Sequence, residues 1–211
     1  MNYEQIKVLL IARLGNRTDL EGSIEAELAI AQENLEQSWS DMTMPWFLQK
    51  EGVITIPAGE DSVALPADFL REHDDGLHRY QEAGGDAMPM DKLFPENLAA
   101  EEYGEAYGCI NQKPYAVAGT TLTVYPAAVA EATITLSYFG AEAALSSETY
   151  ENKWSRYAPE LLIAVTGRKL ASYIRDAELT QIFTADADVE STRLIRASEM
   201  RNTANIKMEI V

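Results

Sequence analysis

The sequence is poor in the side chains that most enzymatic and metal chemistry requires. Its 211 residues include one cysteine, Cys109, and two histidines, His73 and His78. A single thiol excludes an intramolecular disulfide and a multi-thiolate metal site. Nucleophilic catalysis by serine or cysteine normally needs a nearby base, usually histidine. The phosphate-binding glycine motifs and HExxH are absent from the sequence as well. We therefore expect no enzymatic activity, no catalytic residues and no cofactor.

Long hydrophobic runs and an excess of positive charge are also missing. The most apolar early run, residues 6–14, contains Lys7 and Arg13 and is shorter than the ~20 residues of a membrane span. No secretory signal is recognisable, so we expect a soluble, unprocessed protein. Lysine and arginine number 17 against 34 aspartates and glutamates, a net charge of −17. Such a protein lacks the basic footprint needed to bind nucleic acid. The charge favours solubility or a surface that must not adhere to DNA.

Both histidines lie in one short acidic segment, residues 71–80. Imidazole and carboxylate groups are suitable metal ligands, so His73, Asp75 and His78 could form a small metal or binding site. The alternative is a solvated polar turn between two short strands. We favour the turn and expect no metal.

Helical patterns occupy both ends of the chain. Asn2 and Gln5 can cap a first helix that ends near Gly15, and Thr18 begins a capping box for a second. The second helix carries a stripe of apolar residues at steps of three and four: Leu20, Ile24, Leu28, Ala31, Leu35 and Trp39. After residue 153 we expect a helix to about 174 and a last helix, capped by Asp176, to about 202.

Residues 114–140 form a compact β island between these helical regions. Gly119-Thr120 is a two-residue link with glycine first, as a tight hairpin requires. Leu122 and Val124 alternate with threonines, as do Ile134 and Leu136 further along, so each strand has one apolar face. Weaker strand patterns occur from residue 52 onward. At the C-terminus Ile206, Met208 and Ile210 alternate before Val211, which indicates an extended segment.

Together these patterns predict an α+β fold. We expect mainly a helical bundle of about four long helices with an inserted antiparallel β lobe and an extended C-terminal tail. The expected boundaries within one domain, 1–211, are a bundle from 1–48 and 153–202, a β lobe over 52–140, and a tail over 203–211.

Five sequence features in this order resemble the head-to-tail connector, or portal adaptor, proteins of tailed bacteriophages, most of all the gatekeeper-type adaptors of short-tailed phages. They are the ARLG stop at 12–15, Pro-Trp at 45–46, ALPADFL at 64–70, PYAVAGTTLTVYPAA at 114–128 and LSYF at 136–139. The resemblance covers nearly the whole chain. It implies a structural virion protein, made in the host cytoplasm and located at the capsid–tail junction.

The resemblance also implies partners. It places a ring of about twelve copies, a dodecamer, beneath the portal protein, where head-to-tail contacts close the ring. That ring extends the channel through which genomic DNA passes without specific binding, and it offers a platform to tail or nozzle proteins. The alternating tail (Ile206, Met208, Ile210, Val211) suits addition of a strand to a portal sheet edge. The basic residues Arg193, Arg196 and Arg201 are the candidate portal-facing side. Another connector, a stopper or tail-completion protein, is the alternative.

Overall fold

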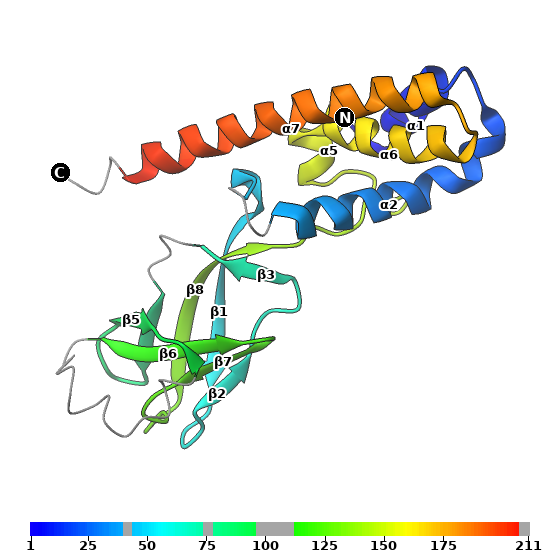
Figure 1. Ribbon diagram of the computed structural model, residues 1–211. Helices are drawn as coiled ribbons and strands as arrows, with labels where there is room; N and C mark the ends of the chain where they lie inside the picture. Colours follow the sequence, from blue (N-terminus) through cyan, green and yellow to red (C-terminus); the bar gives the residue numbers. More distant parts are fainter. Residues whose placement is uncertain (40–43, 74–77, 96–111, 207–211) are drawn as a thin grey trace. The chain divides into compact units, whose positions relative to one another are not determined.

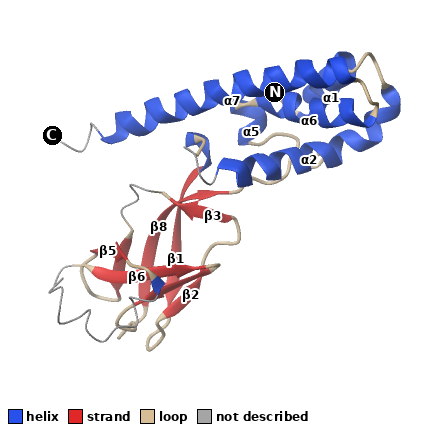
Figure 2. Cartoon of the chain, in the orientation of Figure 1, coloured by secondary structure: helices blue, strands red, loops and turns tan. Residues whose placement is uncertain are grey.

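The chain folds into two compact units. The computed structural model describes residues 1–39, 44–73, 78–95 and 112–206. The helical unit combines Met1–Leu48 with Ala141–Val211, and the β unit is Gln49–Gly140. In sequence the β unit is therefore an insertion in the helical unit. Figure 1 follows the chain through both units by colour, and Figure 2 separates helices from strands.

The helical unit contains α-helices of very different lengths. Its described elements are α1 (Tyr3–Arg13), the 3-10 turn η1 (Thr18–Leu20), α2 (Glu21–Ser38), the 3-10 turn η3 (Trp46–Leu48), α5 (Lys153–Tyr157), α6 (Pro159–Tyr173) and α7 (Ala177–Ile206).

Local signals explain most of these boundaries. Asn2 and Gln5 form the capping box expected for α1, in which the Asn2 side chain accepts the Gln5 N–H at 2.9 Å. The box expected at Thr18 is wrong, because residues 18–20 form a 3-10 turn and α2 begins at Glu21 without a side-chain cap. Pro159 begins α6, which divides the single helix expected after residue 153 into α5 and α6.

Helix α6 lies at the centre of the helical unit and packs against α1, α2 and α7. Its buried side chains include Leu162, Ile163 and Leu170. Gly167 permits a close approach to α7, because a Cβ placed there would lie 2.6 Å from Cζ of Phe183. The aromatic ring of Phe183 thus occupies the space that any larger residue at 167 would need.

Buried polar side chains fix the segment that returns from the β unit into the helical unit. Gln32 donates to the Glu142 carbonyl at 2.9 Å, and Asn152 donates to the Gln32 side chain at 2.8 Å. Glu36 accepts from the Trp154 indole at 2.8 Å and from the Glu142 N–H at 3.2 Å. Burial raises the pKa of Glu36, although these hydrogen bonds act in the opposite direction. The network attaches the returning segment to α2.

The β unit is one eight-stranded sheet. Along the sheet the order is β1-β8-β4-β5-β6-β7-β2, and β3 also pairs with β8. The strands are β1 (Gln49–Ile56), β2 (Ser62–Ala64), β3 (Phe69–Glu72), β4 (Arg79–Glu82), β5 (Met88–Lys92), β6 (Lys113–Ala118), β7 (Thr121–Val124) and β8 (Ala132–Gly140). Its hydrophobic core includes Ile56, Tyr80, Leu122 and Ile134.

The one-sided strands of the β island are confirmed. Gly119, with φ of +60°, links β6 to β7, and Val117 pairs with Leu122 across that hairpin. Leu122, Val124 and Ile134 are buried, whereas Thr121 is exposed. Glycine is favoured at this left-handed turn position because it has no Cβ.

The expected fold class is wrong in its proportions and in its sheet. The chain is about 46% helical and carries a large, nearly closed, barrel-like mixed sheet rather than an inserted antiparallel lobe on a bundle of about four long helices. The parallel pair is β5 with β6, in the register Met90 to Lys113. Pairing between distant strands closes this sheet, and alternation within a strand shows only which side is buried.

The extended tail is also wrong where the structure describes it. Helix α7 runs for 30 residues and continues through Ile206, so residues 203–206 are helical. Residues 207–211 lie outside the described part of the chain.

Candidate interaction surface

The longest helix, α7, presents one face to the helical unit and one to solvent. Asp176 caps its first turn as expected, since its carboxylate accepts the Leu179 N–H at 2.9 Å. Phe183, Ala187 and Leu194 form the buried stripe. At 100° per residue, positions 182, 189, 193, 196 and 200 fall on the opposite side.

This outward face combines apolar and basic side chains. Val189 is 64% and Met200 is 75% exposed, and Ile182 is half exposed. Arg193 and Arg196 are exposed between them. Exposed apolar residues that gather on one face of a helix mark a surface for association. We call the face formed by Ile182, Val189, Arg193, Arg196 and Met200 the α7 face.

A shallow hollow of about 470 Å³ lies on this face, lined by Asp188, Val189, Thr192, Arg193 and Arg196. Arg193 approaches Glu190 at 3.6 Å, an exposed pair that contributes little stability. Arg196 forms no ion pair with another residue in the described part of the chain. Its charge is therefore available to an acidic partner.

Arg201 does not share this surface, although we expected it to act with Arg193 and Arg196. Its guanidinium lies 3.6 Å from the ring centroid of Trp46. Trp46 also packs edge-on against Tyr157 at 4.8 Å, and its backbone N–H donates to the Ser198 hydroxyl at 3.3 Å. A cation over an indole face is a stabilising contact, so Arg201 attaches the end of α7 to the helical unit.

Of the four expected tail residues, the structure describes one. Ile206 is the last residue of α7, so it does not begin a strand. Met208, Ile210 and Val211 lie outside the described residues.

A second hollow was not expected from the sequence. It has a volume of about 610 Å³, lies on the outward side of α1 and is lined by Glu4, Val8, Leu9, Tyr150 and neighbouring residues. Val8 is 61% exposed, although it lies in an apolar segment. Tyr150 is not part of α1. It reaches the hollow from the returning segment, where the Asn2 side chain donates to its hydroxyl at 2.9 Å. We call this surface the α1 hollow.

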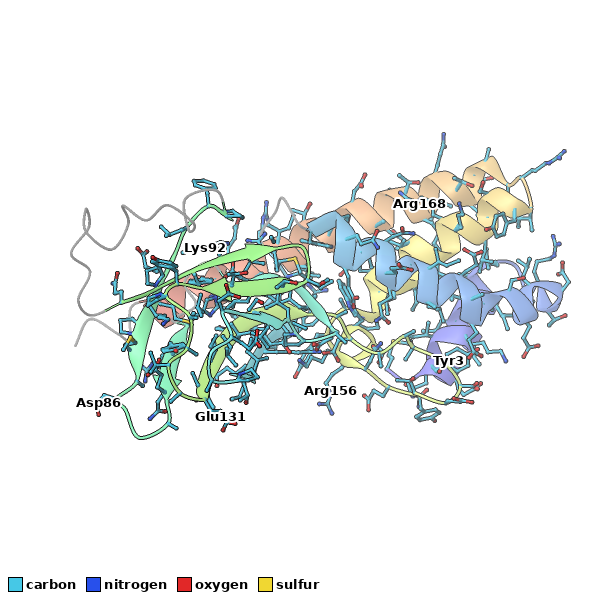
Figure 3. The ribbon with its side chains drawn as sticks, turned by 90° about the horizontal axis from the view of Figure 1, so that it is seen from below. Tyr3, Asp86, Lys92, Glu131, Arg156 and Arg168 are labelled. Carbon is cyan, nitrogen blue, oxygen red and sulfur yellow. The ribbon has the colours of Figure 1, made fainter. Side chains whose placement is uncertain are left out.

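The candidate metal residues have other partners. His78 Nδ1 accepts the Ser137 N–H at 3.2 Å, so its proton is on Nε2, which donates to Glu72 at 3.1 Å. The Tyr115 hydroxyl donates to the same Glu72 oxygen at 2.7 Å, and Lys92, labelled in Figure 3, donates to the other oxygen. Burial opposes ionisation of Glu72, but the bonds from His78, Lys92 and Tyr115 prevail and lower its pKa to about 2.

His73 is apart from this cluster and packs its ring against Phe139 at 5.1 Å. Asp75 lies outside the described residues. Within the described ranges no group of three or more histidine, cysteine, aspartate or glutamate side chains is placed to hold a metal ion. The Glu72 cluster joins β3, β5, β6 and the residue directly before β4, so what it supplies is a polar brace within the β unit.

These features define a two-unit α+β protein whose exposed helix faces are its candidate sites. A family model described as SU10 adaptor protein matches residues 1–206. The chain therefore belongs to the SU10 adaptor family and is a phage structural adaptor, a virion component that interacts with other virion proteins. No curated protein matches the chain. Among the described helices, none is both long and apolar enough to span a membrane.

Proposed function

We propose that this protein is the head-to-tail adaptor of a tailed phage, without catalytic activity, and that it forms a ring under the portal. The observation that carries this proposal is the family match, which extends over residues 1–206 and thus includes both units. A ring needs two different surfaces on each subunit. The helical unit offers two outward surfaces, the α7 face and the α1 hollow.

The charge of the β unit supports a role beside DNA. Residues 49–140 contain five lysines and arginines against 15 aspartates and glutamates, a net charge of −10. Asp86 and Glu131 are exposed on the loops that lead into β5 and β8, and both are labelled in Figure 3. A wall of this sign repels the DNA backbone, so duplex DNA would pass through the ring without being held.

The end of α7 is the part that we propose meets the portal. Arg201 holds α7 against Trp46, and beyond this contact α7 continues to Ile206. The attached end of α7 would then bring the residues that follow it into contact with the portal. These are residues 207–211, with Met208, Ile210 and Val211. The ring in turn would offer a platform to tail or nozzle proteins.

Imaging of the purified protein mixed with its cognate portal tests the proposal. We expect a ring of this protein, of about twelve copies, on one end of the portal. A portal from an unrelated phage is the control and should carry no ring. If the protein stays monomeric and unbound at low and high salt, the adaptor assignment is refuted. Binding at the tail side of another adaptor would instead support a stopper or tail-completion protein.

A further inference from the structure

We propose that the α1 hollow is the docking site for the α7 face of a neighbouring copy of this chain. This inference rests on the proposed ring and names the surfaces that would close it. It assigns Arg193 and Arg196 to contacts between subunits and leaves only the end of α7 to the portal.

The two surfaces have matching apolar character. The α1 hollow is lined mainly by apolar atoms of Val8, Leu9 and Tyr150. Val189 and Met200 are among the most exposed large hydrophobic side chains of the described residues, and both belong to the α7 face. Burial of such side chains in a hollow removes apolar surface from water on both partners. The two surfaces therefore match in polarity, with exposed Val189 and Met200 side chains on α7 facing an apolar lining beside α1.

Their charges are opposite. Glu4 lines the α1 hollow, and Glu148, two residues before Tyr150, is exposed nearby in sequence. The α7 face presents Arg193 and Arg196. Asp188 is the acidic residue that lines the same α7 hollow, so the match is carried by the two arginines. Complementary charge of this kind sets register and orientation between partners.

The position of the two surfaces suits a head-to-tail contact. Helices α1 and α7 both pack on α6, and each turns its outward side away from it. The two surfaces are different patches of the same subunit. A contact between the α7 face of one copy and the α1 hollow of the next therefore repeats from copy to copy and does not close a symmetric dimer. One helix face buries less than the ~800 Å² per partner of a stable interface, so we expect isolated pairs to be weak and a portal to template the ring.

Charge reversal on both sides tests the pairing in full-length protein. Arg196→Glu and Glu4→Arg should each reduce ring assembly on the portal by about tenfold or more. The double variant should restore assembly, because each interface again brings opposite charges together. Arg168→Glu is the matched control, since Arg168 is exposed on α6 (Figure 3) and lies outside both surfaces. Thermal unfolding of each variant separates lost assembly from lost folding.

Crosslinking provides a second, independent readout. In a Cys109→Ser background, Val8→Cys and Val189→Cys are made in separate proteins, which are mixed and treated with a short thiol-reactive crosslinker on the portal. We expect one crosslinked product that contains both proteins and none from either protein alone. Because each chain has one cysteine, no crosslink within a chain can form.

The outcomes distinguish this inference from the function on which it rests. If wild-type protein forms rings, and the single reversals assemble as well as Arg168→Glu, the α1–α7 pairing is wrong while the adaptor function stands. The same holds if rings form but no mixed crosslink appears. If wild-type protein forms no ring on the portal, the proposed function fails and the pairing fails with it.

Discussion

The close contact between Gly167 and Phe183 gives the sharpest prediction about stability. Replacing Gly167 with alanine would place a Cβ 2.6 Å from Cζ and 2.7 Å from Cδ1 of the Phe183 ring. Ordinary contact between carbon atoms requires about 3.5–4.0 Å, so α7 or the ring must move by roughly 1 Å. Gly167 and Phe183 are both buried, which leaves little room for that movement.

Two opposing contributions set the change in the free energy of unfolding that Gly167→Ala causes. Overpacking of a well-filled core typically costs about 1–3 kcal/mol. Alanine favours a helix over glycine by about 1 kcal/mol, which offsets part of that cost. We therefore expect Gly167→Ala to lower the free energy of unfolding by up to about 2 kcal/mol. Gly22→Ala on α2 is the matched control, because a Cβ at Gly22 meets no atom within 4 Å and should be neutral or slightly stabilising.

Tryptophan fluorescence is the appropriate assay. All three tryptophans, Trp39, Trp46 and Trp154, belong to the helical unit, so denaturant titrations followed by their emission report on that unit. Phe183→Leu should relieve the contact, so Gly167→Ala should cost less in that background than in the wild type. The reasoning is refuted if Gly167→Ala alone is as stable as Gly22→Ala.

Three further predictions concern other parts of the chain. The pKa of Glu72 is lowered to about 2, so its ionised form contributes stability above pH 4.5 that is lost as pH falls toward 2. In acid titrations followed by circular dichroism, Glu72→Gln should remove about 2–3 kcal/mol of that dependence after allowance for solvent screening, and an unchanged acid profile would contradict the brace. Arg201→Ala should increase acrylamide quenching of Trp46, whereas Arg201→Lys should preserve part of the protection, and equal quenching in all three proteins would exclude the stacking role. Deletion of residues 207–211 should leave the unfolding curve unchanged and abolish docking on the portal, and full docking by the shortened protein would show that the end of α7 is not the portal contact.

The sequence predicts structure well where a pattern is local. The Asn2 capping box, the α2 stripe and the Asp176 cap are all confirmed, because each depends on residues within a few positions of one another. The β6–β7 hairpin is confirmed for the same reason. The parallel pairing of β5 with β6 could not be predicted, because alternation shows which face of a strand is buried but not which strand lies beside it.

The same distinction applies to the candidate sites. Arg193 and Arg196 are three residues apart, so a helix necessarily brings them to one face. Arg201 was expected to act with them, but its position is decided by Trp46, which lies far away in the sequence. The α1 hollow was missed because Tyr150, which completes it, belongs to the second segment of the helical unit and lies far from α1 in the sequence. The available signal for this hollow was Val8, an apolar residue that is exposed on α1.

The closure of the sheet changes how association by this protein should be understood. An open sheet offers edges to which another chain can add a strand, whereas a nearly closed one presents few unpaired backbone groups. The β unit is therefore a poor acceptor for a neighbour's strand, and any strand added by residues beyond α7 would need an edge supplied by the portal. In the proposed ring, contacts between copies would then be made by side chains on helices. The exposed apolar residues Val8 and Val189 lie on such helices, and this is why we place the subunit contact in the helical unit.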